Sequence, residues 1–224
     1  MQLFTHIYQL KLIPPTGVLF IFVLSLTLCA SAGQRIDAYF AKMPQTVLPL
    51  LDKTARLDLL DLYNSHLTPK VENVYGGQSA LLTKTDDYIQ IRCTDASSWQ
   101  MKLLPVAHDT LIVCISTVRG LNTYSRLTYY RGSDWHQVKR DLPQPAFNLF
   151  VKSAGETLPT RLQSSLDVLR NCPIQLTLSE REPILTCALS LAVLPLEAQK
   201  NLTPLLQSVR YKWTSGKWVL LPNR

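Results

Sequence analysis

The sequence predicts an α+β fold in which antiparallel β-meanders have helices packed on one face, arranged as two similar halves. Apolar residues first recur with a helical period, near residues 36–43 and 57–63. The period then changes to two along several short segments that have short connectors between them. The order of helix, meander and aromatic hairpin then recurs in the second part of the chain.

Two short helices are expected at the start of the globular part. Pro44 ends the first helix because its ring cannot continue the helical hydrogen-bond ladder. Either Asp52 or Thr54 caps the second helix through its side-chain oxygen. The side chains expected to face the core are, for the first helix, Ile36, Tyr39, Phe40 and Met43 and, for the second, Leu57, Leu60 and Tyr63.

Alternating segments then predict strands with one buried and one solvated face. The apolar members of this alternation are Ile89, Ile91 and Cys93, followed by Trp99, Met101 and Leu103. The run 111–115 is apolar throughout and predicts a strand that is covered on both faces. Short connectors favour antiparallel pairing of neighbouring segments.

The second half is expected to repeat this plan. A helix is predicted over 157–170, alternating strands near 174–179 and 185–191, a short helix from Pro195 to about 206, and a final hairpin turning at 214–216. The predicted organisation is a segment 1–32, a first half 33–138, a connector 139–156 and a second half 157–224. The halves resemble each other either by duplication of one α+β unit or because antiparallel meanders look alike by chance.

The N-terminal segment has the pattern of a secretory signal peptide. Lys11 precedes an apolar run at 17–28, and the small residues Ala30, Ser31 and Ala32 form an A-x-A cleavage site. We therefore expect cleavage after Ala32, export from the cytoplasm, and no stable membrane span in the mature protein. An uncleaved membrane anchor is the alternative interpretation.

Composition is that of a globular protein, with 46% hydrophobic and 17% charged residues. The formal net charge of +7 is spread along the chain, with no block of like charges and no series of Lys or Arg residues interleaved with aromatic residues. This distribution argues against a nucleic-acid partner. The cysteines of the mature chain either pair in disulfides or remain as buried free thiols, and their spacing does not fix a pairing: Cys93, Cys114, Cys172 and Cys187.

Residues with catalytic or metal-binding chemistry do not form a recognisable pattern. The histidines lack metal-ligand spacing, and the acidic residues near the second helix lack the glycine-centred loop of a calcium site. These residues are His66, His108, His136, Asp58, Asp61 and Glu72. Cys172 is the one cysteine in a loop-like context. We therefore predict no catalytic, metal or cofactor-binding residues and a protein that is not an enzyme.

Aromatic residues gather on the predicted strands and form the candidate binding surface. On an open sheet face they could hold a sugar or a protein partner, whereas in a core they would only pack. The candidate residues are Trp99, Tyr129, Trp135, Tyr211, Trp213 and Trp218.

Several stretches, in order and spacing, carry a resemblance to a known family. They include residues 56–61, 75–81, 85–89, 101–105, 178–185 and 204–219. Over about 34–221 the chain resembles the exported bacterial family catalogued as domain of unknown function 3256. The resemblance implies a signal peptide and the periplasm or cell envelope of a Gram-negative bacterium, and it supplies no catalytic residues.

These observations lead to one functional expectation with two alternatives. We expect an exported envelope protein that is non-catalytic and binds a partner, either an envelope protein or a glycan. The alternatives are a dedicated glycan-binding module, which needs at least two tryptophans exposed on one surface, and a hydrolase assembled from distant residues. A hydrolase would need a pocket in which a histidine meets a carboxylate or Cys172.

Overall fold

A computed structural model describes residues 35–106, 109–120, 123–152 and 166–222. The predicted signal peptide, 1–32, lies outside the described residues. Residues 34–224 form one compact unit. Within the described ranges, no helix is both long and apolar enough to cross a membrane.

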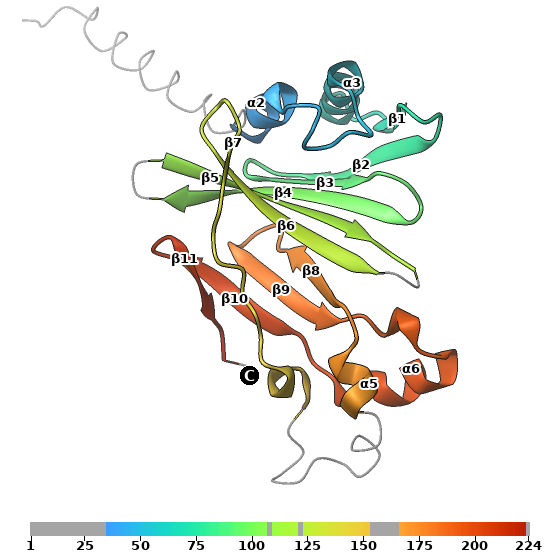
Figure 1. The fold of residues 1–224 in the computed structure, drawn as a ribbon. Coiled ribbons are helices and arrows are strands. Elements are labelled where there is room, and N and C mark those ends of the chain that lie inside the picture. The colour runs from blue at the N-terminus through green and yellow to red at the C-terminus, as the bar shows by residue number, and fades with distance from the viewer. Residues whose placement is uncertain (1–34, 107–108, 121–122, 153–165, 223–224) are drawn as a thin grey trace, which may run out of the picture. The chain divides into compact units, whose positions relative to one another are not determined.

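The first sheet is a seven-stranded antiparallel meander whose strands follow one another in chain order (Figure 1). This arrangement confirms the meander predicted from alternation and short connectors. Its strands are β1 (Lys70–Glu72), β2 (Gln78–Lys84), β3 (Tyr88–Arg92), β4 (Ser97–Val106), β5 (Asp109–Val118), β6 (Tyr124–Arg131) and β7 (His136–Val138).

Helices α2 (Arg35–Lys42) and α3 (Lys53–Asn64) cover one face of this sheet (Figure 1). The predicted apolar face of α2 is confirmed, since Ile36 and Phe40 are fully buried. Leu57 was expected to face the core but is 38% exposed, and Leu59 takes the buried position beside Leu60. The helix is therefore rotated from the predicted orientation, because its packing against the sheet sets which side is buried.

Asp52, rather than Thr54, caps α3. Its Oδ1 accepts a hydrogen bond of 2.8 Å from the Ala55 N–H. We expect Asp52→Ala to lower the free energy of unfolding by about 1 kcal/mol, because a helix-end N–H loses its acceptor. Urea denaturation checks this, with Asp52→Asn as the control that keeps the acceptor oxygen. An equal loss in both variants would show that the negative charge, rather than the cap, matters.

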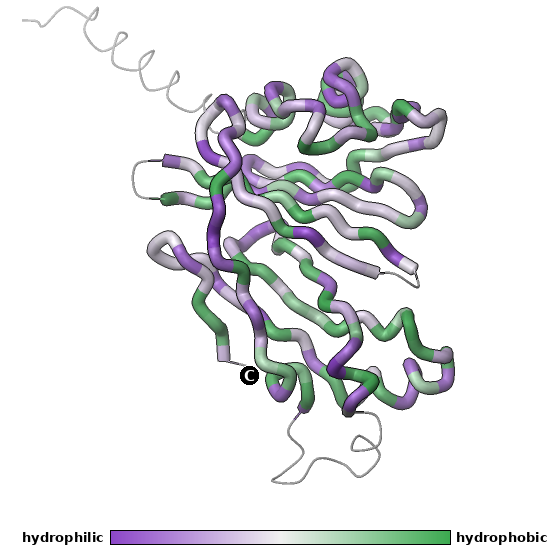
Figure 2. The backbone as a smooth tube through the Cα atoms, in the orientation of Figure 1, coloured by the Kyte–Doolittle hydropathy of each residue, from purple (hydrophilic) through white to green (hydrophobic). Residues whose placement is uncertain are grey.

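A second sheet covers the opposite face of the first. Its antiparallel strands β8 (Ile174–Leu178), β9 (Ile184–Leu189), β10 (Val209–Thr214) and β11 (Lys217–Leu220) have the order β11-β10-β9-β8. Apolar side chains from β5 and β6 form one core with those of β9 and β10. The molecule thus has three layers: helices, a seven-stranded sheet and a four-stranded sheet (Figures 1 and 2).

The expectation that β4 has one solvated face is wrong, because the second sheet covers that face. Gln100 and Lys102 alternate with the apolar residues as predicted, yet they are 6% and 0% exposed. Gln100 Oε1 accepts a 2.8 Å hydrogen bond from the N–H of Leu178, and the Ser125 hydroxyl accepts one of 3.0 Å from the N–H of Leu176. These polar side chains satisfy backbone donors of the edge strand β8, which lies across the face of the first sheet.

A third apolar cluster closes the end of the second sheet. Its buried residues are Val151, Leu169, Cys172 and Leu202. Leu169 and Leu202 belong to α5 (Leu166–Arg170) and α6 (Leu196–Leu202), and Val151 and Cys172 lie just after η1 (Phe147–Phe150) and α5. Partly buried apolar residues of η1, η2 (Leu191–Val193) and η3 (Thr203–Leu205) pack against them. Only the end of the helix predicted over 157–170 is described, because residues 157–165 lie outside the described ranges.

In both halves a helix precedes the first strand and the last two strands form a hairpin, but in the second half η2, α6 and η3 stand between β9 and β10. Strands β5, β6 and β7 hold the places in their sheet that β9, β10 and β11 hold in theirs. Strand β3, however, is separated from β5 by β4, whereas β8 is directly beside β9. The duplication and the boundaries 33–138, 139–156 and 157–224 stay predictions, and residues of both halves enter one core.

The four cysteines of the described chain are buried free thiols. Burial raises the pKa of Cys93 and of Cys187 to about 12, and it raises the pKa of Cys114 well above its usual value. Because the thiolate is the reactive form, these side chains act as small apolar core residues.

Candidate functional site

The most chemically distinctive hollow lies where residues 139–143, here called the strap, cross the hairpin β10–β11. Its volume is about 660 Å³. We call it the cationic pocket. It is lined by Tyr129, Arg131, Val138, Lys139, Arg140, Asp141, Leu142, Pro143, Tyr211, Trp213, Gly216, Lys217 and Trp218.

The hairpin provides the aromatic wall. Ser215 and Gly216 turn it with φ values of 51° and 81°, the left-handed pair that suits a two-residue hairpin. The turn sets Trp213 directly opposite Trp218 in the strand register. Their rings meet edge to face, with centroids 5.1 Å apart and planes at 70°. The two indoles therefore stabilise each other and fix the hairpin side of the pocket.

Tyr129 joins the first sheet to this wall. Its hydroxyl oxygen accepts a 2.9 Å hydrogen bond from the Trp218 Nε1–H. Burial raises the pKa of Tyr129 to about 12, outweighing the opposing effects of that hydrogen bond and of Arg140. Tyr129 is therefore a neutral phenol at physiological pH, and it can donate its own proton while accepting from Trp218.

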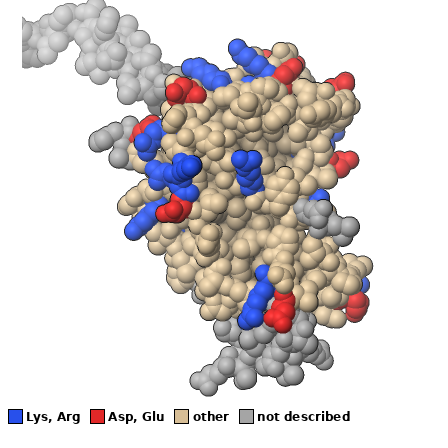
Figure 3. Space-filling view, in the orientation of Figure 1, with Lys and Arg blue, Asp and Glu red and all other residues tan. Residues whose placement is uncertain are grey.

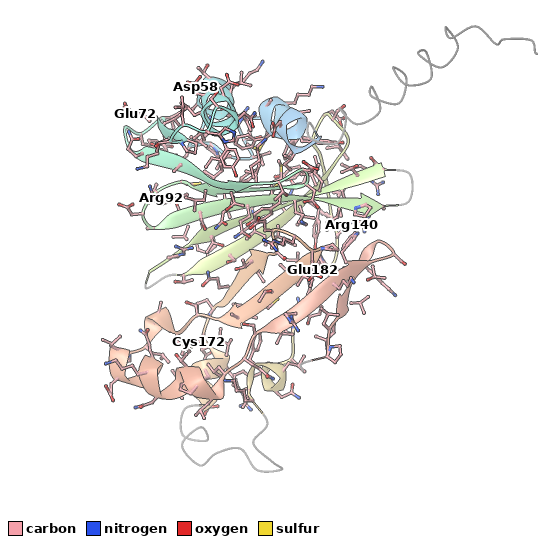
Figure 4. All side chains as sticks on the ribbon, turned by 180° about the vertical axis from the view of Figure 1, so that it is seen from behind. Asp58, Glu72, Arg92, Arg140, Cys172 and Glu182 are labelled. Carbon is pink, nitrogen blue, oxygen red and sulfur yellow. The ribbon has the colours of Figure 1, made fainter. Side chains whose placement is uncertain are left out.

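Arg140 fastens the strap to the hairpin. Its Nη1 donates a 2.8 Å hydrogen bond to the Gly216 carbonyl, and its guanidinium lies 5.6 Å from the centre of the Trp213 ring. Figure 4 labels Arg140 at the side of the molecule where the two sheets meet. The contact spans 76 residues of chain. It places a half-buried cation in a defined position on the pocket wall.

Positive charge dominates the lining. Arg131, Lys139 and Lys217 are exposed and join Arg140, whereas Asp141 is the one acidic residue among the lining residues. The strap begins as a hydrophilic stretch (Figure 2), and Lys and Arg side chains gather on the edge of the molecule near the β10–β11 hairpin (Figure 3). Such a set of cations creates a local potential that attracts anions.

A second hollow, the acidic groove, lies between α3 and β1 and has a volume of about 750 Å³. Its lining includes Asp58, Asp61 and Glu72, so the structure brings together the acidic residues that the sequence singled out. Figure 4 shows Asp58 and Glu72 on the helix side of the first sheet, away from Arg140. Within the described residues, no group of His, Cys, Asp and Glu side chains is arranged to hold a metal ion.

The predicted aromatic surface is not an open face. Trp99, Trp135 and Trp213 are 1%, 4% and 5% exposed, because layers on both sides cover the first sheet. Tyr129 and Tyr211 are also buried, and Trp218 is partly buried. The glycan-binding alternative required two tryptophans exposed on one surface, and the described residues do not meet that requirement.

The structure divides the predicted aromatic residues between two places. Four of them meet at the cationic pocket: Tyr129, Tyr211, Trp213 and Trp218. Trp99 and Trp135 instead belong to the core beneath the helices, where Trp99 packs on Phe40 at 5.9 Å and Trp135 on Tyr130 at 5.3 Å.

The residues proposed for a hydrolase do not converge in the described ranges. None of the residues His66, His136 and Cys172 lines the cationic pocket, and none of them lines the acidic groove. Cys172 is buried, and desolvation raises the pKa of its thiol. His108 lies outside the described residues.

The cations of the pocket were not predicted from the sequence. Lys139, Arg140 and Asp141 stand in the irregular connector, where no periodicity indicates which side chain faces a partner. Two signals were present: the Trp-rich hairpin with its Ser-Gly turn, and the basic pair that directly follows β7. Neither shows that the strap and the hairpin meet.

The comparisons with known proteins concern family and fold. No curated protein matches the chain. A solved domain of an uncharacterised protein from Porphyromonas gingivalis W83 is similar in structure, with a TM-score of 0.69 and 23% sequence identity. The match covers 86% of this chain and 100% of that domain, and at this identity it supports the fold alone. A family model described as protein of unknown function (DUF3256) matches residues 28–218, and the chain therefore belongs to this family.

Proposed function

We propose that this protein is an exported, non-catalytic binding protein of the bacterial envelope whose ligand site is the cationic pocket. The observation that carries the proposal is the joining of two distant segments by Arg140, which forms a walled hollow from the strap and the hairpin. Clefts with aromatic walls and a few placed polar groups are the usual form of small-ligand sites.

The side chains of the pocket favour binding over bond-breaking chemistry. Arginine does not lose its proton in proteins, and Tyr129 has a pKa of about 12, so neither serves as a general base near neutral pH. The lining contains no histidine or cysteine. Its groups can hold a ligand by charge, hydrogen bonds and ring contact.

The N-terminal sequence supports the envelope part of the proposal. The pattern over residues 1–32 has the charge, apolar run and small residues of a signal peptide. A binding protein outside the cytoplasm would meet nutrients, envelope fragments or surface components. Fractionation of cells that express the full chain tests this part, since a cytoplasmic location of the uncut protein would contradict it.

The pocket itself is tested by ligand screening with the mature chain. A library of small metabolites and envelope fragments is screened by tryptophan fluorescence, because Trp213 and Trp218 lie in the pocket wall. We expect at least one ligand whose affinity falls by about tenfold or more in Trp218→Ala, the loss that follows from removing a contact worth about 1.4 kcal/mol.

The control is Trp135→Phe, a change beneath the helices on the opposite face of the first sheet, which should leave ligand affinity unchanged. Mass spectrometry of the recovered ligand distinguishes binding from turnover. Ligand returned chemically altered would favour the hydrolase alternative. A folded protein that binds nothing in the library, or equal losses in both variants, would overturn the pocket as the ligand site.

A further inference from the structure

We infer that the ligand of the cationic pocket carries an oxyanion group, a carboxylate, sulfate or phosphate, which is bound by Arg140 and the Tyr129 hydroxyl. The inference rests on the proposed function and specifies its ligand class. Three independent features of the pocket support it: a buried donor without an acceptor, a cation held in place, and an excess of positive charge.

The buried donor is the Tyr129 hydroxyl. The side chain is 3% exposed and lines the pocket. Its oxygen already accepts from Trp218, so the phenolic proton is left to donate, and the hydroxyl donates no hydrogen bond to a described residue. Buried polar groups are normally paired, and a ligand oxygen in the pocket would supply the missing acceptor.

The cation held in place is Arg140. One of its N–H groups donates to the Gly216 carbonyl and its guanidinium carbon lies over the Trp213 ring, which leaves other N–H groups of the planar fork for a ligand. Arginine forks bind oxyanions with two parallel hydrogen bonds. Because the side chain is already ordered, a ligand would not have to immobilise it.

The charge excess belongs to the pocket as a whole. The lining holds four cations and one carboxylate. Arg131 has its own partner outside the lining, Asp109, at 3.2 Å, and both side chains are nearly half exposed. That surface pair contributes little energy and leaves the guanidinium accessible. The remaining cations, Lys139 and Lys217, stand at exposed positions and would steer an anion inward.

The test uses matched probes that differ in charge: galacturonic acid against galactose, and glucose 6-phosphate against glucose, by calorimetry with the mature chain. We expect each acid to bind about tenfold or more tightly than its neutral partner, as a charge-assisted hydrogen bond predicts. The carboxylate and phosphate arms show which oxyanion the pocket prefers. Raising the salt concentration should weaken binding of the acids.

Variants assign the effect to residues. We expect Arg140→Gln to weaken binding of the acids about tenfold or more, and Arg140→Lys to recover only part of this loss, because lysine lacks the fork. Tyr129→Phe, which keeps the ring and removes the donor, should weaken it about three- to tenfold. Arg170→Gln is the matched control, since Arg170 also stacks on an aromatic ring at 5.6 Å but lies outside the pocket.

The two proposals fail in different ways. If a library ligand binds and responds to Trp218→Ala, but neutral probes bind as well as acids and Arg140→Gln has no effect, the oxyanion inference is overturned and the binding function stands. If no probe and no library ligand binds the folded protein, the proposed function fails and the inference fails with it.

Discussion

Replacing Trp99 by alanine is expected to lower the free energy of unfolding by about 3–5 kcal/mol, the range for removing a large aromatic side chain from a packed core. Trp99 is 1% exposed near the start of β4 and lies against Phe40 of α2, with ring centroids 5.9 Å apart. The alanine variant would leave a cavity between helix and sheet that the layers cannot fill, because both strands beside β4 hold it in register.

Urea denaturation followed by far-ultraviolet circular dichroism measures this loss. Trp99→Phe is the graded control, since it keeps a ring against Phe40 and should lose clearly less than the alanine variant. Leu57→Ala on the exposed side of α3 is the surface control and should change stability by no more than about 0.5 kcal/mol. A Trp99→Ala variant as stable as Leu57→Ala would show that the helices do not pack on this face.

Local periodicity predicted the elements of the fold well. The face of α2, the alternation of β3 and β4, and the run that forms β5 each reflect a preference expressed within a few residues. The final hairpin turned where Ser215 and Gly216 permit positive φ. Family membership was also predicted from the sequence, because the matching stretches keep their order over most of the chain, and the family model matches residues 28–218.

The layer arrangement was not predictable in the same way. Gln100 and Lys102 are polar and alternate with apolar residues, a pattern that normally indicates a solvated face. Their partners Leu178 and Glu180 lie 78 residues further along the chain, and nothing in the local sequence indicates that these residues come into contact. Long-range contacts of this kind decide which alternating strand has a second sheet above it.

The candidate site was likewise predicted only in part from the sequence. The aromatic half of the pocket was singled out because tryptophan and tyrosine on strands are informative by themselves. The cationic half was missed because Arg140 stands in an irregular segment, where neither period nor motif fixes its direction. Packing in the core is the usual role of an aromatic residue on a strand. The pocket could be recognised only from the structure, in which the strap crosses the hairpin.

The second large effect is expected at the junction between the two sheets. Lys102 is fully buried on β4, yet its Nζ donates to the Glu180 carbonyl at 2.9 Å and pairs with Asp87 at 3.1 Å. The ammonium also lies 5.7 Å from the centre of the Tyr88 ring. We expect Lys102→Ala to lower the free energy of unfolding by about 3 kcal/mol, because it removes a buried stem and leaves the Glu180 carbonyl without this donor.

A double-mutant cycle separates the ion pair from the packing. Lys102→Met keeps most of the apolar volume and should lose less than Lys102→Ala, because Asp87 is about half exposed and regains water when its partner is gone. Asp87→Asn should also destabilise, since it leaves the buried ammonium without its counter-charge. Coupling between Lys102→Met and Asp87→Asn of at least about 0.5 kcal/mol is expected for side chains in direct contact.

The cycle also decides how the sheets are held together. Hydrogen exchange in Lys102→Met should show faster exchange of the β8 amides, since Glu180 lies two residues after that strand and its carbonyl loses the Lys102 donor. The β2 and β3 amides beneath the helices should keep their protection apart from the global loss of stability. Uniform loss of protection, with coupling near zero, would mean that apolar contacts alone hold β8 on the first sheet and that Lys102 is only tolerated there.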